Sequence, residues 1–113
     1  PRFHQFLSGH ITDSRFSLFN ENALNVGKCL GQCNIVAADY IFSGLPFALF
    51  PRQKQRDIIK ETCRHLRPGG KFIIYQYSRK IKKLLCEMFS RVDVHFVPLN
   101  ILPAYVFVCS NEP

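Results

Sequence analysis

The residues best suited to chemistry in this chain form one turn, Ser43-Gly44-Leu45-Pro46, directly after an apolar run over residues 35–42. Continuous apolar runs of this kind are typical of strands buried between two helical layers of a parallel sheet. Pro46 fixes its own φ and favours extended backbone at Leu45, and Gly44 permits backbone angles that other residues resist. Open α/β sheets bind ligands at the carboxyl ends of their strands. The position of the turn therefore makes it a candidate site.

The cysteine and histidine residues predict neither a metal site nor a nucleophile. Cys29 and Cys33 are close in sequence, but the other three of the five cysteines form no second pair and no nearby His completes a zinc set. The four His residues are scattered, without a Cys or carboxylate at the spacing that activates a nucleophile. We interpret all five cysteines as reduced thiols, as in a cytoplasmic protein.

The charge balance favours an anionic partner. Fifteen Lys and Arg against eight Asp and Glu give a formal net charge of +7, concentrated in residues 52–60 and 79–83. Such clusters suit nucleic acid or a phospholipid surface, the latter with the protein peripheral to the inner face of the membrane. The alternative is that both clusters are solvated helix faces. The chain starts at Pro1 without Met and shows no signal peptide, so we interpret it as a piece of a longer protein.

The elements that must position the turn follow an α/β pattern within one domain, residues 1–113. The patterns predict strands over 16–19, 35–42, 71–77, 92–97 and 104–109, and helices over 52–66 and 79–89, with helical segments over 3–11 and up to Leu30. Apolar stripes predict the buried helix faces, with Ile58, Ile59, Cys63 and Leu66 on one helix and Ile81, Leu84, Leu85 and Met88 on the other. The joint over 98–103 is too short for a helical crossover, so the last two strands should pair antiparallel.

Three motifs carry a resemblance to the second half of class I S-adenosylmethionine-dependent methyltransferases. They are Glu21-Asn22-Ala23, Ser43-Gly44-Leu45-Pro46 and Leu66-Arg67-Pro68-Gly69-Gly70-Lys71-Phe72. The resemblance implies a Rossmann-like sheet, mostly parallel with a C-terminal antiparallel hairpin and lacking the first two strands. It makes this chain the C-terminal part of a methyltransferase domain. The fourth strand of that fold, residues 35–42, would then be an exposed edge prone to self-association.

A narrower resemblance is to bacterial phospholipid N-methyltransferases and their ribosomal-RNA-adenine-dimethylase-like relatives. It rests on residues 39–51, on Tyr75-Gln76-Tyr77 and on Asn100-Ile101-Leu102-Pro103-Ala104. The sequence departs from the family in lacking a G-x-G-x-x-G cofactor loop and the ribose-binding carboxylate. Asn22 also stands where the family usually has Asp.

The resemblance implies a role for each motif. Glu21, Asn22 and Ala23 would hold the adenine of S-adenosylmethionine. The carbonyls of Ser43 to Leu45 would orient the substrate amine, with Gly44 allowing close approach and Pro46 holding the turn, and Phe47 and Tyr77 would wall the pocket. Each has a structural alternative: a tight turn, strand-end aromatic packing at Tyr77, and a helix cap at Asn22.

The function implied by the resemblance is S-adenosylmethionine-dependent N-methylation of a phospholipid amine such as phosphatidylethanolamine, with this piece inactive alone. Methylation of RNA adenine suits the positive charge equally well. A different class is a non-catalytic basic module that binds an anionic surface or a partner, which the missing cofactor loop favours.

Overall fold

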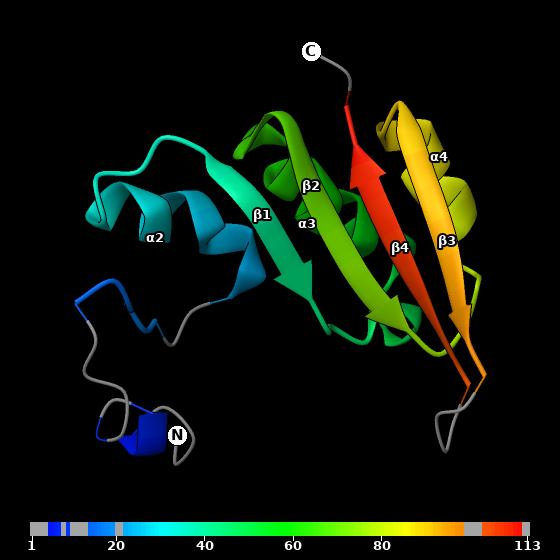
Figure 1. Ribbon diagram of the computed structural model, residues 1–113, viewed down its shortest axis with the longest axis horizontal. Coiled ribbons are helices and arrows are strands. Elements are labelled where there is room, and N and C mark those ends of the chain that lie inside the picture. Colours follow the sequence, from blue (N-terminus) through cyan, green and yellow to red (C-terminus); the bar gives the residue numbers. More distant parts are fainter. Residues whose placement is uncertain (1–4, 8, 10–13, 20–21, 99–102, 112–113) are drawn as a thin grey trace.

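Four strands form one mixed sheet in the computed structural model, which describes residues 5–7, 9, 14–19, 22–98 and 103–111. They are β1 (Ala38–Ser43), β2 (Leu66–Gln76), β3 (Arg91–Val97) and β4 (Ala104–Ser110), in the order β1-β2-β4-β3. β1 pairs parallel with β2, and β4 runs antiparallel to both β2 and β3. Three strands thus point the same way and β4 opposes them (Figure 1). This confirms the predicted sheet and its C-terminal hairpin.

The helices pack mainly on one face of that sheet. α3 (Arg52–Arg64) and α4 (Lys82–Met88) lie behind it in Figure 1, while α2 (Val26–Gln32) lies beside β1. Two short 3-10 helices, η1 (Ala23–Asn25) and η2 (Phe47–Leu49), precede α2 and α3 respectively. Pro51 is the residue before α3, where its fixed φ is compatible with the start of a helix.

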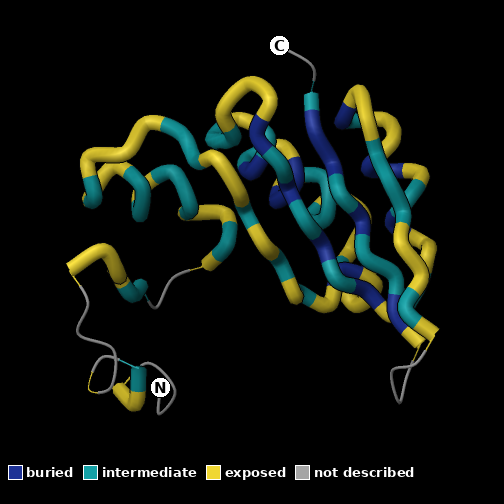
Figure 2. Tube along the Cα trace, viewed as in Figure 1, coloured by how far each residue is buried: buried dark blue, intermediate teal, exposed yellow. Residues whose placement is uncertain are grey.

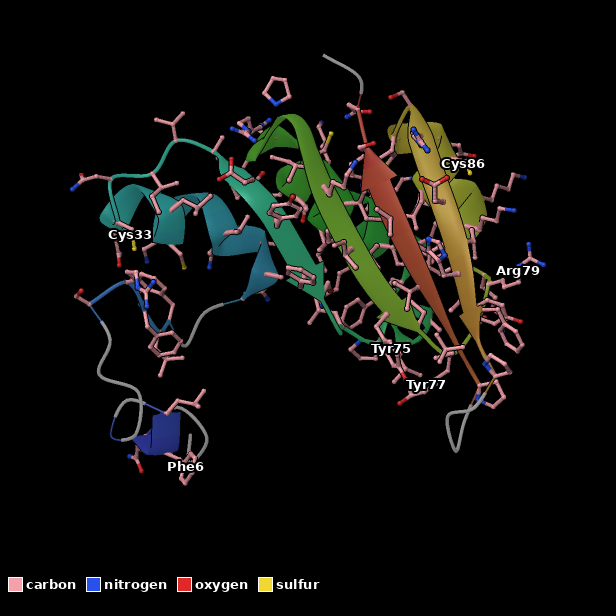
Figure 3. The ribbon with its side chains drawn as sticks, viewed as in Figure 1. Phe6, Cys33, Tyr75, Tyr77, Arg79 and Cys86 are labelled. Carbon is pink, nitrogen blue, oxygen red and sulfur yellow. The ribbon has the colours of Figure 1, made fainter. Side chains whose placement is uncertain are left out.

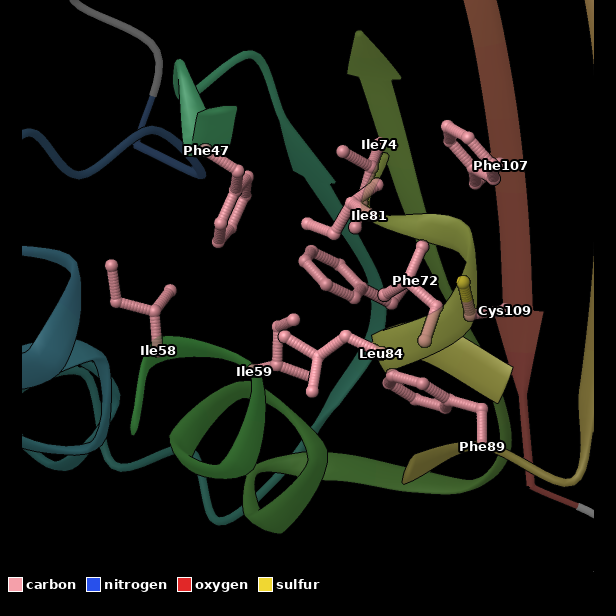
Figure 4. Packing of buried hydrophobic residues seen from close by; sticks show 11 residues of the cluster. Phe47, Ile58, Ile59, Phe72, Ile74, Ile81, Leu84, Phe89, Phe107 and Cys109 are labelled. Atoms are coloured by element: carbon pink, nitrogen blue, oxygen red, sulfur yellow. The ribbon is translucent and has the colours of Figure 1, made fainter. Parts of the chain in front are cut away.

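The core lies between the sheet and the two helices α3 and α4 (Figure 4). Alternate residues of β2 and β4 face the helices, as the two-residue period of a strand requires. The buried residues of the main cluster are Phe47, Ile58, Ile59, Phe72, Ile74, Ile81, Leu84, Leu85, Phe89, Phe107 and Cys109. In the predicted stripes, Ile58, Ile59, Ile81, Leu84 and Leu85 are buried, while Cys63, Leu66 and Met88 are partly buried against them.

The opposite face of the sheet is open among the described residues, which corrects one expectation for β1. The sequence predicted a strand buried on both faces, but Tyr40 and Phe42 are 61% and 73% exposed. Both side chains stack on the face away from α3 and α4, with ring centroids 6.5 Å apart. Figure 2 shows β1 with exposed and intermediate residues and no buried one, at the sheet edge that the resemblance predicted.

The N-terminal segment differs from its predicted conformation. Residues 16–19 form no strand, because the two strands that the resemblance places between them and β1 are not in this sequence. Instead Ser14, Arg15, Ser17 and Phe19 line a hollow of about 470 Å³ together with residues of α2, Cys33 and Ile35. Of the predicted helix over 3–11, residues 5–7 and 9 are helical and the others lie outside the described residues.

Three boundaries of these elements also move. α3 ends at Arg64, and β2 begins at Leu66 rather than at Lys71. Gly69 takes a positive φ of 77° within this early part of β2, and an added Cβ at Gly70 would collide with the Asp39 and Arg67 carbonyl oxygens. The Pro-Gly-Gly stretch is thus structural, as predicted, but as part of the strand. α4 begins at Lys82, three residues later than expected.

Candidate functional site

The turn after β1 is held by its own hydrogen bonds. Leu45 N donates to Ser43 Oγ at 3.2 Å, which closes a local turn around Gly44. Gly44 does not have a positive φ, so the expectation of unusual backbone angles there is wrong. A Cβ added at Gly44 would meet no atom within 4 Å. The glycine therefore keeps space open beside the turn rather than satisfying a backbone requirement.

The carbonyl of Leu45 is already used within the protein. It accepts from Gln76 Nε2 at 2.6 Å and from Phe47 N at 2.9 Å. A carbonyl oxygen has two lone pairs, so these two donors leave none for a substrate amine. The neighbouring carbonyl of Gly44 accepts no loop or side-chain hydrogen bond from the described residues. Of the two carbonyls, only the one at Leu45 is occupied by loop or side-chain donors of the described residues, so the Gly44 carbonyl is the candidate acceptor.

A hollow of about 360 Å³, the larger of two that adjoin the turn, brings residues of all three predicted motifs together. Its lining is mostly apolar, with the hydroxyl side chains of Ser43 and Thr62, and comprises Ala23, Val26, Ile41, Phe42, Ser43, Gly44, Leu45, Thr62 and Phe72. The start of η1 and the carboxyl end of β1 thus share one site, although 19 positions separate Ala23 from Phe42 in the chain.

Of the other predicted cofactor residues, Asn22 does not line this hollow. Glu21 lies outside the described residues. Asn22 caps η1, because its Oδ1 accepts from Leu24 N at 3.0 Å. The structural alternative for Asn22 is therefore realised, and of the two described residues of the motif Ala23 alone lines this hollow.

The two aromatic residues predicted to wall the pocket behave differently from each other. Phe47 is fully buried in the main core, so its ring supports the turn from beneath and forms no open wall. Tyr77 is 60% exposed just after β2, and its ring meets Tyr75 edge-on at 5.4 Å (Figure 3). Burial, and then the neighbouring Tyr77 hydroxyl, raise the pKa of Tyr75. The phenol of Tyr75 therefore stays neutral near neutral pH.

A second, smaller hollow of about 170 Å³ lies on the other side of the turn. It is polar and is lined by Ala48, Arg52, Gln55, Gln76, Ser78, Lys80 and Ile81. Leu45 links the two hollows, because its side chain lines the larger one and its carbonyl binds Gln76 in the smaller one. The sequence analysis assigned none of the residues of this hollow to a site. The available signal was Gln76, a polar residue at an inward position of an apolar strand.

Comparison with known proteins supports the fold and the class. No protein-family model matches the chain. It is 29% identical over 111 residues to an ornithine lipid N-methyltransferase of Singulisphaera acidiphila, covering 96% of this chain and 58% of that protein. An O-methyltransferase family protein from Burkholderia thailandensis has a similar structure, with a TM-score of 0.61 and 14% sequence identity over 96% of this chain and 40% of that chain. The chain thus spans less than two thirds of either protein.

These findings confirm the resemblance to class I S-adenosylmethionine-dependent methyltransferases that the motifs indicated. The sheet, with β1 and β2 parallel and a reversed C-terminal hairpin, agrees with the fold that the resemblance implied. The larger hollow fits one end of such a cofactor, because a flat, apolar adenine ring suits the side chains of Ala23, Val26 and Ile41. Nothing in this sequence corresponds to the family's Gly-rich loop and ribose carboxylate.

Within the described ranges, no helix has the length and apolar character needed to cross a membrane. The same part of the chain contains no group of three or more His, Cys, Asp or Glu side chains placed to hold a metal ion.

Proposed function

We propose that this chain forms the acceptor side of an S-adenosylmethionine-dependent N-methyltransferase that acts on a lipid amine. The observation that carries the proposal is the larger hollow, in which Ala23 from the cofactor motif meets Ser43 and Gly44 from the turn after β1. Methyl transfer requires donor and acceptor to meet at one place, and this hollow adjoins both motifs. The similarity to a lipid N-methyltransferase supports the class of acceptor.

Methyl transfer requires the protein mainly to orient the acceptor amine toward the methyl group. S-adenosylmethionine supplies an activated methyl group when bound. The amine lone pair forms the new N–C bond while the C–S electrons leave on sulfur, and the extra proton on nitrogen passes to solvent. The Gly44 carbonyl can accept an N–H of the amine and so aim its lone pair, and the hydrogen-bonded turn keeps that carbonyl fixed.

The acceptor is proposed to be a head group with a primary amine close to an acidic group. Phosphatidylethanolamine, the substrate expected from the resemblance, and ornithine lipid, named for the relative, both fit this description. The formal net charge of +7 suits delivery to an anionic lipid surface. RNA remains the competing acceptor in the experiment below.

The test is a transfer assay with the full-length gene product and S-adenosylmethionine labelled in its methyl group. Ornithine lipid, phosphatidylethanolamine and RNA are offered separately, and label is followed into each. We expect label in a lipid amine. Label in RNA alone, or in none of the three, would overturn the proposal.

A pair of glycine variants locates the reaction in the hollow. An added Cβ meets no atom within 4 Å at Gly44 or at Gly31, so neither Gly44→Val nor Gly31→Val should disturb the fold. Gly31 lies in α2 outside the hollow. We expect Gly44→Val to lower kcat/KM by about 100-fold or more, because its branched side chain fills the space beside the acceptor carbonyl. Gly31→Val should retain wild-type turnover.

A further inference from the structure

The smaller hollow has a chemistry that methyl transfer by itself does not require. Arg52, at the start of α3, and Lys80, in the loop after β2, both line it. Neither side chain forms an ion pair with a carboxylate of the described residues, whereas Arg56, Arg64, Arg67 and Arg91 all do. Two unpaired cations at one concave site favour an anion, for which both supply charged donors.

The two glutamines of the hollow have fixed orientations. Gln55 Nε2 donates to the carbonyls of Phe47 and Phe50 at 2.7 and 3.1 Å, and Gln76 Nε2 donates to those of Leu45 and Tyr75 at 2.6 and 2.9 Å. A carbonyl only accepts, so the amide nitrogen must face it in each case.

Because the amide nitrogens of Gln55 and Gln76 bind these carbonyls, the amide oxygens are the polar atoms of both side chains that can bind a ligand. No described residue donates a hydrogen bond to either oxygen. An oxygen of this kind suits a ligand N–H and not an anion. The hollow thus combines cationic donors with neutral acceptors, which matches a head group that carries both an acid and an amine.

Ser78 completes the polar lining. Its Oγ accepts from Lys80 N at 3.1 Å, which leaves its O–H free to donate to an anion. A volume of about 170 Å³ corresponds to roughly five or six water molecules. This is room for a small polar group and not for an acyl chain.

We propose that this hollow is a subsite for the acidic group of the acceptor lipid, a carboxylate or a phosphate, held by Arg52 and Lys80. The inference rests on the proposed function and deepens it. Leu45 of the turn lines the larger hollow and its carbonyl binds Gln76 of the subsite, so an acid bound here places the neighbouring amine at the turn. Specificity then comes from the acid as well as the amine.

The experiment uses soluble head-group probes in matched pairs, with the full-length gene product labelled with ¹⁵N. Nα-acetylornithine and N-acetylputrescine share the same amine, but the second lacks the carboxylate. Glycerophosphoethanolamine and ethanolamine differ in the phosphate in the same way. NMR titration follows the side-chain amide signals of Gln55 and Gln76, and no methyl donor is needed.

We expect an acid-bearing probe to shift these signals and to bind at least about tenfold more tightly than its partner. Arg52→Gln and Lys80→Gln should each remove most of that difference. The pair that shows the larger difference identifies the acid as carboxylate or phosphate. Lys60→Gln, on the same helix as Arg52, and Lys83→Gln, near Lys80, should bind as the wild type does, since neither residue lines the hollow.

The outcomes separate this inference from the proposed function. Equal binding within both pairs, no shift at Gln55 and Gln76 up to the solubility of the probes, or full discrimination in both Arg52→Gln and Lys80→Gln would overturn the subsite. Lipid methylation would then still support the methyltransferase. Discrimination that depends on Arg52 and Lys80 without any methyl transfer would keep the subsite and remove the enzymatic function.

Discussion

Gln76 at the end of β2 donates a 2.6 Å hydrogen bond to the carbonyl of Leu45, 31 positions earlier in the chain. The bond joins the last residue of β2 to the turn that follows the neighbouring strand. It is largely buried, with Gln76 only 7% exposed. The turn of the candidate site is therefore anchored to the sheet by a side chain as well as by its own backbone.

Replacing this glutamine should destabilise the protein and loosen the turn. In Gln76→Met a side chain of similar length cannot donate, so the Leu45 and Tyr75 carbonyls each lose a partner. We expect the free energy of unfolding to fall by about 1–3 kcal/mol in urea titrations. Gln53→Met is the matched control, because it removes an exposed hydrogen bond to Asp57 and should cost about 0.5 kcal/mol or less. Equal costs for the two variants would contradict the anchoring role.

Phe47 should prove to be a core residue rather than a ligand contact. Its fully buried ring packs in the main cluster, so Phe47→Ala should lower the free energy of unfolding by about 3–5 kcal/mol. Leu49 belongs to the same 3-10 helix but is 81% exposed, and Leu49→Ala should change stability by less than about 0.5 kcal/mol. Thermal or urea unfolding measures both. A stable Phe47→Ala variant would place the ring outside the core.

Cys109 should make stability fall in alkaline solution. Burial, followed by the nearby Cys86 and Asp93, raises the pKa of the Cys109 thiol to about 12, against 9.0 ordinarily. Between these values the unfolded chain loses the proton that the folded protein keeps, so the free energy of unfolding decreases as pH rises. The stabilisation is complete below pH 9.0.

Urea titrations at about pH 8 and about pH 10 measure this decrease. Cys109→Val removes the thiol and should make the decrease smaller, whereas Cys86→Ser, at an exposed position, should leave more of it in place. The same contrast predicts that a thiol reagent modifies Cys86 in the folded protein and Cys109 only after unfolding. Rapid modification of Cys109 under native conditions would contradict its burial.

The β1 edge should drive self-association of this 113-residue chain when it is produced alone. β1 has Asp39 as its single charged residue, whereas the other edge strand, β3, carries Arg91, Asp93 and His95. Charged residues discourage pairing between edges, so we expect dimers through β1. Light scattering coupled to size exclusion should show that Tyr40→Lys restores a monomer and that Phe96→Lys on β3 does not. A monomeric wild type would contradict the prediction.

The sheet was largely predictable because its signals are local. The apolar runs of β1 and β2, the Pro-Gly-Gly stretch and the short joint over 98–103 each fix an element or its direction. Residues 16–19 show the limit, since their apolar pattern is that of a strand but a strand also needs a neighbour. β1 shows the same limit of sequence-based prediction, because an apolar run does not indicate whether one face or both faces of the strand are covered.

The site was predictable only in position. The turn at Ser43–Pro46 lies at the carboxyl end of β1 as expected. Which of its carbonyl oxygens can bind a ligand, however, depends on residues that are far away in the sequence. The Leu45 carbonyl is occupied by Gln76, and no local pattern connects two residues so far apart in the chain. Phe47 and Tyr77 both follow the end of a strand, but η2 turns Phe47 into the core while Tyr77 stays exposed.

The tyrosine pair at the end of β2 has an optical consequence. The chain contains four Tyr and no Trp, so its near-ultraviolet emission comes from tyrosine. Tyr75 and Tyr77 flank Gln76, and their rings lie 5.4 Å apart. The two-residue period of a strand turns Tyr75 to the face of the sheet opposite Gln76. The protein thus carries an unlabelled fluorescent reporter at the end of β2, and a single Trp on a partner that binds there would act as an energy acceptor for it.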